Sequence, residues 1–184
     1  MSQTDVIEQF RQEAKAASAR VFFPDNLEQA LAYAVDLARE QNRGGLAAPG
    51  LPAAAGDRLA GLCQEAGVPL VQDGLRAAAD EIGIGLTLAD WGVAETGTLI
   101  IDSRSEELRL ATMLPLAHVA LLSRDKIVAR LTDIAAELAR LMTGTSYLAF
   151  ITGPSRTADI ERVLTIGVHG PAQLHVLILP EGEL

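Results

Sequence analysis

Short apolar runs alternate with amphipathic segments along most of this chain, and this alternation restricts the fold more than any other feature. Strands are expected at 21–23, 68–71, 84–88, 97–102, 118–122, 147–152 and 175–179. Several of these runs are apolar throughout, which is typical of parallel strands that are buried on both faces. The chain is therefore expected to be an α/β protein with an open, largely parallel sheet and helices on both faces.

Between these runs, apolar side chains recur at helical spacing. The expected helices lie at 4–19, from 27 onward, and at 57–66, 108–113, 126–142 and 157–164. Asn26 can cap the second of them, and Ser103 with Glu106 forms a capping-box pattern before the fourth. The segment 126–142 is expected to be the longest helix, because one apolar stripe runs along its whole length.

The length of 184 residues fits one domain. Within it, residues 1–75 form a mainly helical N-terminal portion. Residues 76–184 carry the motifs that could support chemistry. We therefore expect a single α/β domain over 1–184.

The formal net charge of -9 argues against partners that carry many phosphates. Lys and Arg side chains are few and scattered, so neither nucleic acid nor an anionic membrane surface is an expected partner. No apolar run is long enough to span a bilayer. The single cysteine, Cys63, rules out an intrachain disulfide and a self-contained iron–sulfur cluster, and indicates a reducing, cytoplasmic location.

The first candidate ligand loop lies between two expected strands. Gly92 and Gly97 allow a close backbone approach, Thr96 and Thr98 offer hydroxyls, and Glu95 is a candidate catalytic carboxylate. No Lys follows the second glycine, so a P-loop is excluded. A tight hairpin with a solvated Glu95 is the structural alternative.

The second candidate loop follows the expected strand at 147–152. Gly153, Ser155, Arg156 and Thr157 combine a turn, a helix start and a fixed positive charge. Backbone N–H groups at a helix N-terminus and a guanidinium both favour anions. In the structural alternative, Thr157 caps the helix and Arg156 pairs with an acid in its first turn.

The third candidate loop holds His169 and Gly170, just before the last expected strand. An imidazole in such a turn can act as an acid, as a base or as a donor to a ligand oxygen, and can equally bond a neighbouring carbonyl. His118, His169 and His175 lie on different elements without a known ligand spacing, so no metal site is expected.

Ligands in open parallel sheets bind at the carboxyl ends of the strands. This rule selects the loops after 84–88 and 147–152. A dinucleotide fingerprint and a serine-hydrolase nucleophile elbow are both missing from the sequence. If the three loops meet in the folded molecule, Thr96, Arg156 and His169 will line one pocket.

The segments 90–98, 153–161 and 167–171 resemble the signatures of the LUD-domain family, and within it the cluster-free lactate utilisation protein C type. The resemblance covers about the C-terminal half of the chain. It implies a fold of the NagB/RpiA/CoA-transferase type and a part in the bacterial oxidation of L-lactate to pyruvate. It also implies that partner subunits hold the iron–sulfur clusters and that this chain binds no cofactor of its own.

Two functions are compatible with this resemblance. In the first, the chain is a ligand-binding or assembly subunit of a lactate-oxidising system and binds a small anionic metabolite. In the second, it is a free-standing sugar-phosphate isomerase or acyl-CoA transferase-like enzyme, in which Glu95 is the base or nucleophile and Arg156 holds the substrate anion.

Overall fold

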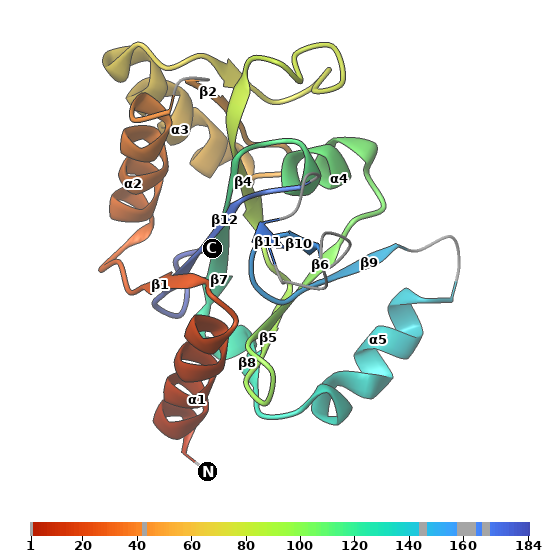
Figure 1. The fold of residues 1–184 in the computed structure, drawn as a ribbon. Coiled ribbons are helices and arrows are strands. Elements are labelled where there is room, and N and C mark those ends of the chain that lie inside the picture. Colours follow the sequence, from red (N-terminus) through yellow and green to blue (C-terminus); the bar gives the residue numbers. More distant parts are fainter. Residues whose placement is uncertain (1, 42–43, 144–146, 158–164, 167–169) are drawn as a thin grey trace.

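The architecture is that of a six-stranded parallel sheet with helices on both faces and a second, smaller sheet beside it (Figure 1). The computed structural model describes residues 2–41, 44–143, 147–157, 165–166 and 170–184, without the side chains of 156, 157, 165 and 166. The parallel sheet has the order β1-β12-β7-β4-β2-β3 and comprises β1 (Arg20–Phe22), β2 (Gly45–Ala47), β3 (Leu70–Val71), β4 (Ile82–Leu88), β7 (Ala117–Ser123) and β12 (Gln173–Leu179). The predicted fold class is confirmed.

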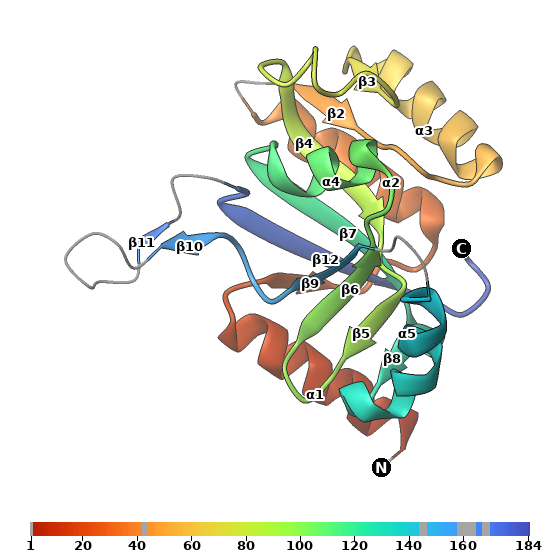
Figure 2. The same ribbon diagram turned by 90° about the vertical axis from the view of Figure 1, so that its right-hand side faces the viewer.

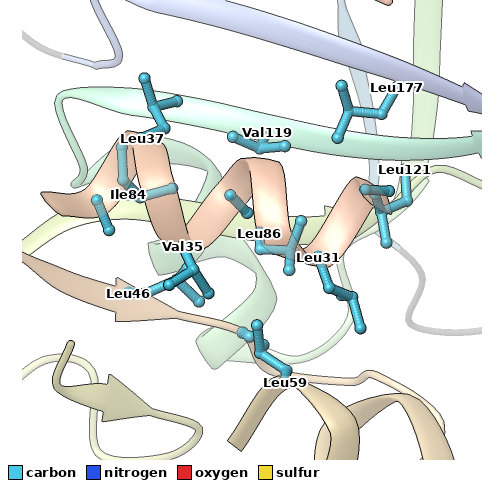
Figure 3. Close-up of a cluster of buried hydrophobic side chains, with 14 of the residues drawn as sticks. Leu31, Val35, Leu37, Leu46, Leu59, Ile84, Leu86, Val119, Leu121 and Leu177 are labelled. Carbon is cyan, nitrogen blue, oxygen red and sulfur yellow. The ribbon is translucent and has the colours of Figure 1, made fainter. Parts of the chain in front are cut away.

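The central strands are apolar throughout because both of their faces are covered. On β7, Val119 and Leu121 pack toward α2 (Leu27–Arg39), as Figure 3 shows. Ala120 and Leu122 lie in the cluster on the opposite face, together with Phe10 of the first helix, α1 (Gln3–Ala16). Alternate side chains of a strand point to opposite faces, so a strand between two cores needs apolar residues at every position.

Helices are divided between the two faces. The helices α2 and α3 (Ala53–Ala66) lie on one face, at the left of Figure 1. On the other face lie α1 (Gln3–Ala16), α4 (Glu106–Met113) and the second sheet, which Figure 2 shows from the front. None of the described helices is long and apolar enough to cross a membrane.

The second sheet has four strands in the order β8-β5-β6-β9. Its members are β5 (Trp91–Val93), β6 (Thr98–Asp102), β8 (Ile127–Val128) and β9 (Leu148–Ile151). β5 and β6 form an antiparallel hairpin, β9 pairs antiparallel with β6, and β8 pairs parallel with β5. A further ribbon joins β10 (Arg156–Thr157) and β11 (Thr165–Ile166). The sequence pattern did not predict this division into two sheets.

The predicted long helix at 126–142 is wrong. In its place the structure has the end of η1 (Arg124–Lys126), then β8, η2 (Leu131–Ile134) and α5 (Ala135–Leu141). Its apolar stripe serves two separate cores. Ile127 packs in the cluster of α1, whereas Ile134 and Leu138 pack behind the second sheet.

Two predicted helix starts also differ from the structure. α4 begins after Ser105 without a side-chain cap, and the Ser103 hydroxyl donates to the carbonyl of Ile101, so the predicted capping box is wrong. The backbone of Thr157, where another helix was expected to begin, is paired in the β10–β11 ribbon, and its side chain is not described, so its capping role stays a prediction. The remainder of the helix expected at 157–164 lies outside the described residues.

The N-terminal portion, 1–75, contributes more than helices. α1, α2 and α3 are accompanied by β1, β2 and β3, which occupy both edges of the parallel sheet. β1 pairs with β12, and β2 pairs with β4. Strands from both portions of the chain therefore share one hydrogen-bonded sheet.

Candidate functional site

A cavity of about 920 Å³ lies between strand β9, helix α4 and the amino ends of β7 and β12. The described residues that line it are Ser103, Arg109, Thr112, Met113, Leu114, Pro115, Leu116, His118, Tyr147, Leu148, Ala149, Phe150, Ile151, Thr152, Gly153, Pro154, Ser155, Gly170, Pro171 and Leu174. The carboxyl-end rule selected one of its loops, at 153–155, but β9 belongs to the second sheet, and the parallel strands β7 and β12 reach the cavity with their amino ends.

One wall of the cavity is the edge of β9 that pairs with no strand in the described part of the chain. All four residues of Leu148–Ile151 line the cavity, although alternate side chains of a strand point in opposite directions. β9 is the terminal strand of its sheet, and β6 pairs along its other edge. The cavity is therefore bordered by strand backbone as well as by side chains.

The positive charge in the cavity comes from Arg109 on α4. One guanidinium nitrogen, Nη1, donates to the carbonyl oxygens of Ser103 (2.7 Å) and Arg104 (2.9 Å). The guanidinium carbon lies 5.3 Å from the ring centroid of Tyr147, within the range of a cation–π contact. These contacts fix the guanidinium in place before any ligand arrives.

The described lining contains no Asp or Glu, although the chain carries 24 acidic residues. Within the described part of the chain, Arg109 makes no ion pair. A guanidinium without an ion pair among the described residues, at a partly apolar cavity, favours an anion, since charge-assisted hydrogen bonds strengthen away from bulk water.

His118 lies on the floor of the cavity and is almost completely buried. Its Nε2 is 2.8 Å from the hydroxyl of Thr87 on β4. Burial, together with the nearby His175, lowers the pKa of His118 to about 4. The imidazole is therefore neutral near pH 7 and can exchange a hydrogen bond with a ligand without adding charge.

His175 occupies the other face of the parallel sheet. Its Nδ1 is 2.7 Å from the hydroxyl of Tyr33, and its Nε2 is 3.0 Å from Oε1 of Gln173. Burial lowers its pKa to about 4 as well. Within the described ranges, no three His, Cys, Asp or Glu side chains converge as metal ligands would.

Two of the three predicted loops meet at the cavity. Gly153, Ser155 and Gly170 all line it, and the N–H of Ser155 donates to the carbonyl of Pro171 (2.8 Å). Gly170 has a φ of +95°, and a Cβ there would lie 3.0 Å from the Cβ of Ser155. The loops are thus in direct contact, and a glycine makes that contact possible.

The third predicted loop is a hairpin turn that reaches the cavity only indirectly. Thr96 and Thr98 are not among the lining residues, but the hydroxyl of Thr98 is 2.7 Å from that of Thr96 and 2.7 Å from that of Thr152. Thr152 does line the cavity. A chain of three hydroxyls therefore joins the hairpin to the cavity wall.

The other residues of this hairpin have contacts within the protein. A Cβ on Gly92 would lie 2.8 Å from Leu122 and 3.0 Å from Phe10, so this glycine makes room for core side chains. Glu95 is exposed, and its carboxylate accepts a hydrogen bond from the N–H of Leu131 (3.0 Å). Glu95 is not among the residues that line the cavity.

The remaining predicted site residues are described only in part or lie outside the described residues. Arg156 and Thr157 belong to β10, and their side chains are not described. His169 lies outside the described residues. The expected convergence of Thr96, Arg156 and His169 on one pocket therefore stays a prediction.

Sequence reasoning missed Arg109, His118 and Tyr147 as parts of one site. Arg109 follows Glu106 by three positions, and this spacing is typical of an ion pair on the surface of a helix. In the structure Glu106 pairs with Arg76 instead. No local signal links these side chains, because they come together only in the folded molecule, where α4 packs on β4 and β7 and Arg109 reaches the ring of Tyr147.

A second, smaller cavity of about 350 Å³ does lie at carboxyl ends of the parallel sheet, near β4. Among its lining residues, Asp90 accepts a hydrogen bond from the N–H of Asp102 (2.6 Å), and Arg104 pairs with the carboxylate of Asp102 (2.6 Å). Burial raises the pKa of Asp90. These groups already bond to one another, which is typical of a structural network.

The hydroxyl chain can be tested by Thr98→Val, which keeps the side-chain shape and removes the central hydroxyl. We expect the free energy of unfolding to fall by about 1–2 kcal/mol, since two hydrogen bonds are lost and their partners stay partly buried. Urea denaturation measures this. Thr143→Val is the matched control: its exposed hydroxyl makes one local bond, to Arg140, and a change below about 0.5 kcal/mol is expected. Equal effects of the two substitutions would contradict a stabilising role for the row of three threonine hydroxyls.

Comparison with known proteins places these features in context. The family model described as LUD domain matches residues 7–179. A protein of Anoxybacillus flavithermus named Lactate utilization protein C is 38% identical over 104 residues, which are 56% of this chain and 47% of the relative. The protein of the same name from Bacillus subtilis is 33% identical over 107 residues, which are 56% of this chain and 45% of the relative. The chain thus spans about half the length of these curated relatives.

A solved structure supports the fold. The crystal structure of a DUF162 family protein from Deinococcus radiodurans superposes with a TM-score of 0.66, covering 97% of this chain and 99% of the other. The two sequences are 21% identical, so the likeness concerns the fold alone.

Proposed function

The chain belongs to the LUD domain family, and on that premise we propose that it is a ligand-binding or assembly component of a bacterial lactate utilisation system, with an anionic metabolite in the cavity beside β9. Relatives named Lactate utilization protein C support the choice of system. Because the chain spans only about half of those relatives, their function is carried over here as part of the proposal.

One observation carries the binding role. Arg109 is held by two backbone carbonyls and by the ring of Tyr147, in a cavity whose described lining has no carboxylate. A structural arginine in a chain of net charge -9 would ordinarily find an acidic partner. A guanidinium that is fixed in this way, and that makes no ion pair with a described residue, favours an anionic ligand.

The redox chemistry of lactate oxidation is assigned in this proposal to iron–sulfur subunits that associate with the chain in the cytoplasm. Cys63 is the one cysteine of the sequence and is buried, and one thiolate cannot hold a cluster. The chain then contributes ligand binding or assembly, and the electrons pass through its partners.

The alternative, a free-standing isomerase or transferase that uses Glu95, gains no support from the position of that residue. A catalytic carboxylate must come within hydrogen-bond reach of the reacting atoms. Glu95 bonds to the N–H of Leu131 and lies outside the lining of the 920 Å³ cavity. The binding role is therefore preferred.

Growth on L-lactate tests the proposal. Deletion of the gene in its host is expected to abolish growth on L-lactate but not on glucose, and the wild-type gene should restore it. Arg109→Leu is expected to restore growth poorly at equal protein level. Arg140→Leu, which removes a side chain that is 77% exposed and pairs with Glu137, should restore growth fully. Normal growth of the deletion strain on L-lactate would refute the proposed function.

Association with partners is a separate expectation. Anaerobic co-expression with the iron–sulfur proteins of the same system should yield a complex that survives affinity purification and gel filtration. If the chain elutes alone under these conditions, the assembly role is wrong, and only the ligand-binding role remains in the proposal.

A further inference from the structure

The volume of the cavity beside β9 does not match a three-carbon acid. Pockets of roughly 300–1,000 Å³ typically enclose ligands the size of drugs or cofactors. At about 920 Å³ this cavity lies near the upper end of that range, and L-lactate would fill only a minor part of it. A ligand that uses the space must carry a substantial body besides its anionic group.

The side chains that line the cavity indicate the polarity of the part of the ligand that carries no charge. Phe150 on β9 is 51% exposed and Leu116 before β7 is 43% exposed, and both line the cavity together with Leu114 and Leu174. Large apolar side chains that remain exposed around one cavity mark a binding surface. The body of the ligand is therefore apolar.

The charged end of the cavity accepts one anionic group. Arg109 uses Nη1 for two backbone carbonyls, while its Nε and Nη2 have no hydrogen-bond partner among the described residues. A guanidinium presents its donors in a planar fork that matches a carboxylate. Arg109 is the one Lys or Arg of the described lining, and its guanidinium balances one negative charge.

We propose that this cavity binds an amphipathic monocarboxylate, with its carboxylate on Arg109 and an apolar chain or ring along Phe150, Leu116 and Leu114. The inference rests on the proposed function, because it names the class of ligand for the same site. It excludes L-lactate itself as the occupant. His118 and Thr87 then form a neutral, hydrogen-bonded floor beneath the ligand.

Isothermal titration with a homologous series tests the inference. The probes are acetate, L-lactate, butanoate, hexanoate and octanoate, with octanamide as the uncharged counterpart of the longest acid. Burial of each added methylene should tighten binding about twofold to fourfold. From butanoate to octanoate, which adds four methylenes, the Kd should therefore fall by about 16-fold to 250-fold. Octanamide should bind at least about tenfold more weakly than octanoate, because it lacks the charge that Arg109 balances.

Two pairs of variants locate the binding. Arg109→Leu should weaken octanoate binding at least about tenfold, whereas Arg140→Leu should leave it unchanged. Arg109 also holds two backbone carbonyls, so Phe150→Ser provides an independent test at an exposed side chain. Phe150→Ser should reduce the gain per methylene, and Leu131→Ser, at an exposed leucine outside the cavity, should not.

Three results would overturn the inference. One is equal affinity along the series, and another is binding that is unaffected by both Arg109→Leu and Phe150→Ser. The third is a dimer in light scattering that dissociates on Phe150→Asp, because a second copy of the chain would then cover the cavity. Tight binding of L-lactate without any gain from chain length would refute the amphipathic ligand and leave the proposed function intact. Loss of growth on L-lactate after gene deletion reports on the proposed function alone.

Discussion

Replacement of Gly97 by alanine is expected to lower the free energy of unfolding by roughly 2–5 kcal/mol, or to prevent folding altogether. Gly97 has a φ of +62°, in the left-handed region that disfavours alanine. A Cβ there would lie 2.2 Å from the backbone nitrogen of Ala14 and 2.5 Å from the carbonyl carbon of Glu13. Since these atoms belong to the backbone of α1, no side-chain rotation can relieve the clash.

Gly61→Ala is the matched control for this substitution. Gly61 is an exposed position of α3, and a Cβ there meets nothing within 4 Å. Alanine should stabilise this helix by about 0.5–1 kcal/mol relative to glycine. Urea denaturation of both variants gives the comparison. If Gly97→Ala were as stable as the wild type, the close contact between the hairpin and α1 would be wrong.

Acidification is expected to destabilise the protein strongly through His118. The pKa of this imidazole is about 4 in the folded protein and about 6.5 in the unfolded chain. Between pH 4 and pH 6.5 the imidazole binds a proton in the unfolded chain but not in the folded protein. The stability that its neutral form contributes is therefore fully present above pH 6.5 and is lost as the pH falls toward 4. At pH 5 the loss due to His118 is roughly 2 kcal/mol. His175, whose pKa is lowered in the same way, adds to it.

The variant His118→Gln separates this effect from other titrations. We expect its stability to decline less steeply than that of the wild type between pH 7 and pH 5, with the remaining decline due mainly to His175. Urea midpoints at intervals of half a pH unit measure the slopes. Identical slopes for the wild type and His118→Gln would mean that the pKa of His118 is the same in the folded and unfolded protein, and would contradict the lowered pKa of this buried imidazole.

The strands of the parallel sheet were predictable because their environment is uniform. On β7, the alternating pairs Val119 with Leu121 and Ala120 with Leu122 enter two different cores. A short run that is apolar at every position is typical of a strand covered on both faces. The helices α1 and α2 were predictable for a similar reason, since each buries one continuous stripe.

The second sheet was not predictable from local patterns. β8 has only two residues, and Ile127 falls in helical register with Ile134 and Leu138 although the three residues serve different cores. The pairing of β8 with β5 determines its conformation, and that pairing joins residues far apart in the sequence. Tertiary contacts here override a local helical preference.

The candidate site was partly predictable. The loop at Gly153 was selected as an arginine-bearing turn after an expected strand, and the loop at Gly170 was selected for His169; both loops line the cavity. The glycines of the hairpin were interpreted as making room for a ligand, yet Gly92 and Gly97 make room for core side chains and for α1. A glycine in a sequence shows that something approaches the backbone closely, but not what approaches.

The strand order β1-β12-β7 also constrains how the molecule is made. β12 leaves the ribosome after every other strand of its sheet, yet it lies between β1, the earliest, and β7. Until β12 arrives, β1 has no neighbour in this sheet, and one side of β7 stays open. The parallel sheet therefore cannot close progressively during translation. A nascent chain that stalls before residue 173 would expose the apolar flank of β7, and chaperones would have to protect it.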